Sequence, residues 1–95
     1  MFIVIVRFPP INPKQDKEFR EWFEWSNQLL MKLPGFISRK LLVGKDRRYA
    51  AIVEHMGYDT FTAMHSSNEH KLVHERALFL FNGVPRPEFF EVVNT

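Results

Sequence analysis

The sequence has no cysteine, which excludes disulfide bonds, a thiolate nucleophile and any metal site built from cysteine ligands. Its four glycines stand singly, so there is no glycine-rich phosphate-binding loop. No apolar run approaches the length of a membrane span, and the apolar residues 2–6 are too few for a signal peptide. Charges of both signs are mixed, with a net charge of +2. These features favour a cytoplasmic protein that does not bind a membrane.

Aromatic residues, in contrast, are abundant. Ten Phe, two Trp and two Tyr occur among only 95 residues, a length that indicates a single domain over 1–95. Trp22 falls in the apolar stripe of a predicted helix and is expected in the core, whereas Trp25 lies on the flank of that stripe. A domain this small has limited room for so many large side chains. Part of the apolar surface is therefore expected to form an interface or a pocket.

Apolar alternation and turn residues predict four strands, at residues 2–8, 36–43, 48–56 and 88–93. Between them, helical spacing predicts helices at 13–33, 59–64 and 66–81. The expected helix-capping residues are Asn12, Asp59 and Ser66, with Gln15 and Glu69 completing capping boxes. The resulting βαββαβ order predicts an α+β, ferredoxin-like fold, in which both helical regions cover one face of a four-stranded antiparallel sheet.

The strand at 2–8 is apolar on both of its faces, although the helices can cover only one. A second copy of the chain is the simplest cover for the other face. We therefore expect a homodimer in which two sheets meet face to face as a dimeric α+β barrel. RNA-recognition domains share this element order, but their third strand carries several aromatic residues where this chain has only Tyr49. No nucleic-acid partner is expected.

Two histidines four residues apart, His70 and His74, share one face of the last helix. Both flank Val73 and Ala77 and are therefore expected towards the apolar side of this helix. A histidine there can act as an acid, a base or a metal ligand. Two histidines without a suitably spaced carboxylate are too few for a dedicated metal site. His74 remains open between lining a pocket and packing in the core, and His65 is expected to bond to backbone near the helix cap.

Basic residues give two further candidates. Arg7 interrupts the apolar first strand, so it is expected either to pair with Glu54 or Glu91 or to bind an anion in a pocket. A cluster of basic residues lies around the predicted hairpin. It is interpreted either as part of a solvated turn or as a contact for a phosphate or carboxylate. Its members are Arg39, Lys40, Lys45, Arg47 and Arg48.

The chain resembles the antibiotic biosynthesis monooxygenase family of dimeric α+β barrels. The resemblance rests on the order of Pro34-Gly35-Phe36, Glu54, Phe61, His65, Ser67 and His70. It implies a cytoplasmic homodimer that oxidises a small phenolic or quinol compound with O₂ and without a cofactor. His70 or His74 would then be the base, and Arg7 would hold the phenolate. The implied pocket residues are Met64, Trp25, Phe61 and His65.

A second branch of the same superfamily binds and degrades haem. By this resemblance His74 falls at the position of the axial haem ligand, whereas Met64 and Arg7 replace the expected Trp and Asn. Three functions therefore remain as alternatives. They are a cofactor-independent monooxygenase, a haem-binding or haem-degrading protein, and a non-catalytic barrel protein that binds a small ligand or is related to stress.

Overall fold

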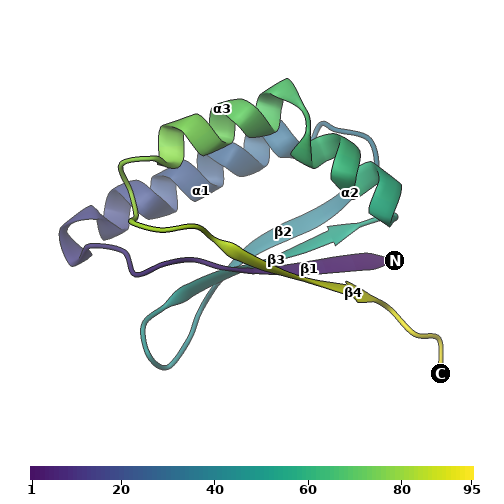
Figure 1. The fold of residues 1–95 in the computed structure, drawn as a ribbon, viewed down its shortest axis with the longest axis horizontal. Helices are drawn as coiled ribbons and strands as arrows, with labels where there is room; N and C mark the ends of the chain where they lie inside the picture. Colours follow the sequence, from purple (N-terminus) through teal and green to yellow (C-terminus); the bar gives the residue numbers. More distant parts are fainter.

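The four strands form one antiparallel sheet, and the helices lie together on one side of it (Figure 1). The strands are β1 (Phe2–Arg7), β2 (Phe36–Val43), β3 (Tyr49–His55) and β4 (Arg86–Glu91), in the order β2-β3-β1-β4. The helices are α1 (Asp16–Leu30), α2 (Tyr58–His65) and α3 (Asn68–Ala77), with a short 3₁₀ turn η1 (Pro13–Gln15) before α1. This computed structural model describes residues 1–95. It confirms the predicted ferredoxin-like α+β fold.

The start of α1 follows the sequence only in part. Asn12 accepts a hydrogen bond from the backbone N–H of Lys14, as expected of a cap. Gln15 does not complete a capping box, because its side-chain amide donates to the carbonyl of Phe79 at 3.0 Å instead. The chain between α3 and β4 is thereby tied to the start of α1. None of the helices combines the length and the apolar character that crossing a membrane requires.

The other two helix starts differ from the prediction. The N-cap of α2 is Gly57 rather than Asp59, and the hydroxyl of Thr60 accepts the Gly57 N–H at 3.2 Å. The N-cap of α3 is Ser67 rather than Ser66, so Glu69 is not positioned for a capping box. The Ser67 hydroxyl accepts the N–H of His70 at 3.1 Å. Helix α3 also ends at residue 77 rather than 81, and β4 begins two residues before its predicted start.

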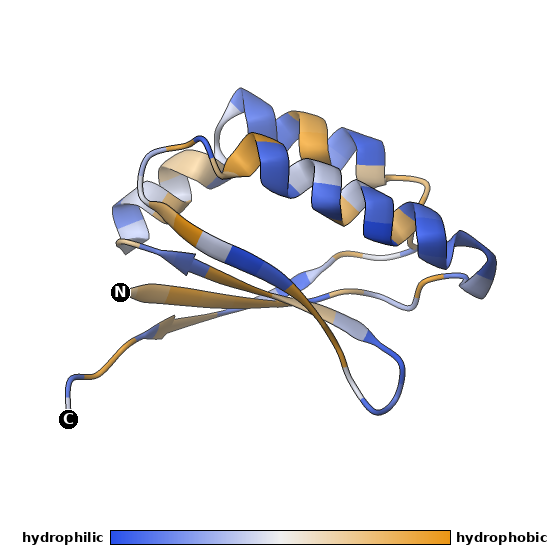
Figure 2. Cartoon of the chain, turned by 180° about the vertical axis from the view of Figure 1, so that it is seen from behind, coloured by the Kyte–Doolittle hydropathy of each residue, from blue (hydrophilic) through white to orange (hydrophobic).

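The core lies between the sheet and the helices. Trp22 is 9% exposed, and its indole N–H donates to the carbonyl of Val73 at 3.0 Å, joining α1 to α3. Trp25 is half-buried, with the guanidinium of Arg76 4.6 Å from its ring centre. The expected contrast between the two tryptophans is confirmed. Figure 2 shows β1 as apolar along most of its length. Because successive strand residues point to opposite faces, β1 presents apolar side chains to both faces of the sheet.

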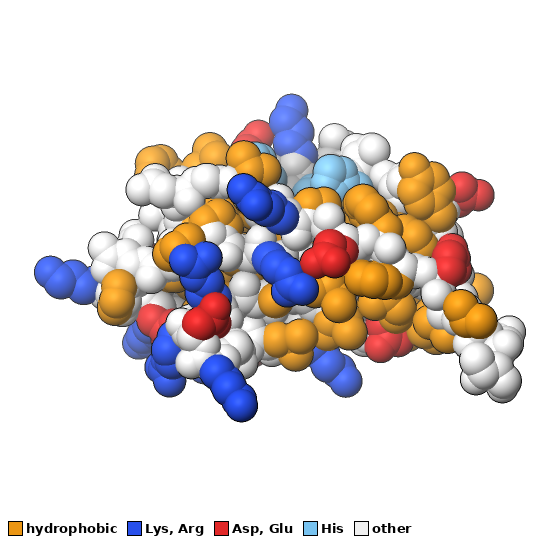
Figure 3. Space-filling model, turned by 60° about the horizontal axis from the view of Figure 1, so that its bottom comes forward, with side chains coloured by type: hydrophobic (Ala, Val, Ile, Leu, Met, Phe, Trp, Pro, Cys, Tyr) orange, Lys and Arg blue, Asp and Glu red, His pale blue; other side chains and the backbone are white.

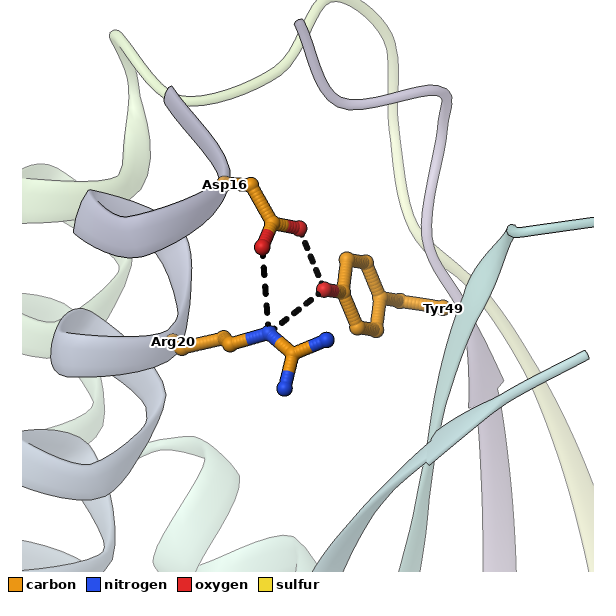
Figure 4. Close-up of polar contacts among 3 residues, drawn as sticks. All are labelled: Asp16, Arg20 and Tyr49. Carbon is orange, nitrogen blue, oxygen red and sulfur yellow. Dashed lines mark hydrogen bonds and ion pairs between the residues drawn. The ribbon is translucent and has the colours of Figure 1, made fainter. Parts of the chain in front are cut away.

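A polar cluster fixes the base of the β2–β3 hairpin to α1 (Figure 4). The Tyr49 hydroxyl donates to the carboxylate of Asp16, and Arg20 Nε donates to the Tyr49 oxygen at 2.8 Å. Arg20 Nε also donates to Asp16 at 3.1 Å. Burial and the hydrogen bond to Asp16 raise the pKa of Tyr49, so its proton is held in the cluster. The contacts therefore hold the hairpin against the helix at the end of the sheet.

The face of the sheet away from the helices carries a group of apolar side chains that nothing covers in the single chain. The pairing register places Ile3 and Ile5 of β1 on it, next to Ile52 of β3 and Phe90 of β4. Phe90 is 44% exposed. Figure 3 brings this side forward and shows apolar side chains gathered over much of it, with charged side chains among them. An uncovered apolar patch on a sheet is typical of a surface that another protein molecule covers.

Arg7 lies on this same outer face. Its Nε donates to the carboxylate of Glu88 at 3.1 Å, and both side chains are at least half exposed. The ion pair expected from the sequence is present, but its partner is Glu88 of β4 and not Glu54 or Glu91.

Candidate functional site

A β-bulge in β2 turns Arg39 towards the helices. Phe36 pairs with His55, but Ser38 pairs with Glu54, so one extra residue stands in β2 between these pairs. Arg39 then pairs with Val53, whose side chain is in the core. Strict alternation would have placed Phe36 and Arg39 on opposite faces. The bulge instead puts an arginine on the inner face of the sheet.

The guanidinium of Arg39 is held by neutral groups of α1. Nη1 donates to Ser26 Oγ at 2.6 Å and to Asn27 Oδ1 at 2.7 Å. The guanidinium also lies over the ring of Phe23, 4.0 Å from its centre. No ion pair includes Arg39. A cation removed from water without an anionic partner is costly, and such a site favours a bound anion.

Burial lowers the pKa of Arg39 to about 10. Desolvation disfavours the charged form of a base, which explains the direction of this shift. The guanidinium nevertheless stays positively charged at neutral pH, because about 10 is still well above 7.

His70 lies on the same side of the sheet, near the start of α3, and is half-buried. Its ring centre is 4.4 Å from that of His65, which ends α2 and is exposed. Burial lowers the pKa of His70 to about 4, and the nearby positive charges of His65, Arg39 and His74 act in the same direction. At neutral pH the imidazole of His70 is therefore uncharged and has one ring nitrogen free to accept a proton.

Two of the predicted catalytic residues do not join His70. His74 is exposed on α3, so its expected place towards the apolar side is wrong for the single chain. The buried residues of α3 are Val73 and Ala77, and His74 follows Val73 by one residue, about 100° around the helix. Arg7 lies on the outer face of the sheet, opposite to the side that carries α3. The guanidinium on the side of His70 belongs to Arg39.

The four expected pocket residues also lie apart. Phe61 is packed in the core with Phe2 and Phe89, and His65 is exposed. Met64 borders a hollow of about 220 Å³ between α2 and the loop before β2. Trp25 borders a second, more open hollow of about 320 Å³ between α1 and α3. Neither of these two hollows is lined by all four residues.

A further histidine, His55, is completely buried on the inner face of β3. Its ring lies between Phe36 and Phe61, and Nδ1 is 3.0 Å from the hydroxyl of Thr60. Nε2 has no hydrogen-bond partner. Burial lowers the pKa of His55, so its imidazole is neutral. His55 is thus a core residue of the single chain.

The structure gives no group of three metal-ligand side chains that could hold a metal ion. The positions implied for haem do not converge either. His74 projects from the exposed side of α3, Met64 is buried, and Arg7 lies on the far face of the sheet. Within one chain these residues do not form a haem pocket.

No protein-family model matches this sequence, and no curated protein matches it. Solved structures do match over nearly the whole chain. One is a candidate antibiotic biosynthesis monooxygenase from Nitrosomonas europaea, 11% identical, with a TM-score of 0.84 over 99% of this chain and 100% of that one. A second is SnoaB, a cofactor-independent oxygenase from Streptomyces nogalater, 19% identical, with a TM-score of 0.78 over 99% and 93%.

A third is the protein Rv0793 from Mycobacterium tuberculosis, 13% identical, with a TM-score of 0.82 over 99% of this chain and 96% of that one. At such low sequence identity, structural similarity shows a shared backbone fold and does not show that the side chains of a functional site are shared. The chain has the fold of the antibiotic biosynthesis monooxygenases.

Proposed function

We propose that the chain is a cytoplasmic, homodimeric monooxygenase that oxidises a small phenolic or quinol-like compound with O₂ and needs no cofactor. The observation that carries the proposal is the half-buried imidazole of His70 on the same side of the sheet as the half-buried guanidinium of Arg39, whose charge acts on it. The shared fold with SnoaB, a cofactor-independent oxygenase, is in keeping with it. Fold alone does not specify function, so the argument depends on these two side chains.

The first step assigned to His70 is removal of a proton from the substrate. An uncharged imidazole accepts a proton, and a half-buried one does so away from bulk water. A pKa of about 4 makes it a weak base in the empty site. A deprotonated substrate beside it supplies a negative charge, which favours the imidazolium and raises this pKa again. The base therefore becomes effective when the substrate is in place.

The positive charge of Arg39 has a complementary role. Deprotonation creates a negative charge on the substrate, and a nearby guanidinium in partly dry surroundings stabilises it. The anion is richer in electrons than the neutral phenol and reacts more readily with O₂. In the overall reaction the substrate loses two hydrogen atoms and gains one oxygen atom, and the second oxygen atom leaves as water. The protein's own contribution is the proton transfer and the stabilised anion.

The dimer belongs to the same proposal. A face-to-face pair of sheets would cover Ile5, Ile52 and Phe90, of which the first two are partly exposed and the third is exposed in the single chain. Burying this face would also remove the Arg7–Glu88 pair from bulk water, and ion pairs at an interface help to fix its register.

Oxygen uptake with a panel of quinols and phenols tests the function. The wild-type protein is expected to consume O₂ above the uncatalysed rate with at least one of them. His70→Gln is expected to lower turnover on the order of 10²–10⁴-fold, because the proton acceptor is lost. Lys71→Gln is the matched control, since Lys71 is exposed on the same helix. No oxygen uptake by the wild type, or equal activity of His70→Gln, would contradict the proposal.

A further inference from the structure

The guanidinium of Arg39 has one edge occupied and one edge free. Both hydrogen bonds to protein come from Nη1, to Ser26 and to Asn27. Nε and Nη2 have no protein partner. The one fully enclosed side-chain nitrogen or oxygen without a partner belongs to His55, so Nε and Nη2 are not sealed off although most of the Arg39 side chain is buried.

This free edge has a definite chemical preference. Nε and Nη2 present two parallel N–H groups, which match the two oxygens of a carboxylate. The opposite edge cannot serve, because Ser26 and Asn27 already use it, and these contacts also fix the plane of the guanidinium. Ser26 is fully buried and Asn27 also donates to the backbone carbonyl of Arg39 at 3.1 Å. The donor edge is thus oriented in advance of any ligand.

The surroundings add to the preference for an anion. The charged groups that lower the pKa of His70 are His65, Arg39 and His74, and no acid is among them. No carboxylate of the protein forms an ion pair with Arg39. The ring of Phe23 lies against the guanidinium, and that of Trp22 is 6.0 Å from it. A ligand on this edge therefore meets a fixed positive charge close to aromatic side chains.

We propose that Arg39 binds the carboxylate of an aromatic acid through its Nε–Nη2 edge. Given the proposed function, the substrate class becomes a hydroxylated aromatic acid, whose carboxylate is held by Arg39 while its hydroxyl is offered to His70. The carboxylate then occupies the free edge of Arg39 and sets the orientation of the ring. His70 performs the proton transfer, and the imidazolium that forms lies beside the deprotonated hydroxyl, so for this substrate class the direct contact of Arg39 is with the carboxylate. Arg39 is in this sense the residue that selects the substrate.

Binding of 2-naphthoate and of its neutral amide, 2-naphthamide, tests the inference by calorimetric titration. Neither compound has a hydroxyl group to oxidise, so binding is measured apart from oxygen uptake. The wild-type protein is expected to bind the acid on the order of 10- to 100-fold more tightly than the amide, as a charge-assisted bidentate contact would give. Equal affinities, or no binding of the acid, would overturn the proposal without any variant.

Arg39→Gln is expected to remove this preference by weakening the acid on the order of 10- to 100-fold while leaving the amide unchanged. Arg39→Lys keeps the charge but loses the planar pair of donors, so an intermediate affinity for the acid is expected. Arg48→Gln, at an exposed arginine of the hairpin, removes the same charge and is expected to change neither ligand. Equal weakening in Arg48→Gln would show a general charge effect and would overturn the assignment.

The experiments distinguish failure of the proposed monooxygenase function from failure of the proposed carboxylate site at Arg39. Oxygen uptake with neutral quinols but no preference for the acid would remove Arg39 as the carboxylate site and leave the monooxygenase. Tight, Arg39-dependent binding of the acid without any oxygen uptake would leave a binding protein for aromatic acids.

Discussion

The imidazole rings of His65 and His70 lie with their centres 4.4 Å apart, where α2 ends and α3 begins. Two protonated imidazoles at that separation would repel each other, and Arg39 adds a third positive charge. Burial is the main cause of the lowered pKa of His70, and this repulsion adds to it, so His70 stays neutral in the folded chain at pH values where an ordinary histidine is charged.

This shift makes stability depend on pH. Between the ordinary pKa of 6.5 and the folded value of about 4, the unfolded chain binds a proton at His70 that the folded chain does not. The free energy of unfolding is therefore expected to fall as the pH is lowered through this range, by about 1–2 kcal/mol after solvent screening. Urea titrations at several pH values between 4 and 7 measure this change in the free energy of unfolding. His55 acts in the same direction, so His70→Gln should flatten the profile only in part, and an unchanged profile would contradict the assignment.

The two tryptophans of α1 are expected to differ in their effect on stability. Trp22 fills the core and donates to Val73, so Trp22→Ala should cost roughly 3–5 kcal/mol in the free energy of unfolding. Trp25→Ala should cost roughly 1 kcal/mol, because it loses mainly the contact with Arg76. Chemical denaturation of both variants provides the comparison. Equal losses of unfolding free energy in the two variants would show that the buried face of α1 is not the one that contains Trp22.

Assembly can be tested on the outer face of the sheet. The protein is expected to be a dimer at micromolar concentration, with an interface larger than about 1,600 Å². Ile5→Glu, in the middle of β1, should give a monomer by light scattering, because a charge would replace the central apolar contact. Leu72→Glu on the exposed side of α3 is the control. A monomeric wild-type protein would contradict the proposed dimer.

Haem titration distinguishes the remaining enzyme alternative. Because His74 projects to solvent away from Met64 and Arg7, haem is expected to bind weakly and without fixed stoichiometry. Tight binding of one haem per chain would contradict this, and loss of the absorption shift in His74→Ala but not in His70→Ala would then identify His74 as the ligand. An unchanged haem spectrum and unchanged turnover in His74→Ala would leave that residue a surface histidine.

The fold could be predicted because its signals are local. Strand alternation, the prolines after β1 and the glycine after α1 each act on their own neighbourhood, and together they imply the element order. The start of α3 was misplaced by one residue because two serines compete for it. Ser67 reaches the N–H of His70, while the hydroxyl of Ser66 bonds backwards to the carbonyl of Thr62.

The candidate site was less accessible to sequence reasoning. The sequence places Arg39 with the basic residues of the hairpin, because no residue in 36–39 indicates that the strand contains an extra residue. The bulge appears only when β2 pairs with β3, and it alone decides that Arg39 faces α1. His70 and His74 were treated alike because they share a helical face. The width of the buried stripe, which includes His70 at its edge and excludes His74, depends on how α3 packs.

The central place of β1 also affects how the chain reaches its fold. Ile5 pairs with Ile52 on one side and with Glu88 on the other, so the first of the four strands to be synthesised has no partner until β3 and β4 have been made. Pairings between such distant residues slow folding, because a long loop must close before they form. During that delay a β-forming segment that is apolar on both faces stays unpaired. Residues 2–6 are therefore expected to be prone to aggregation until β3 and β4 pair with them.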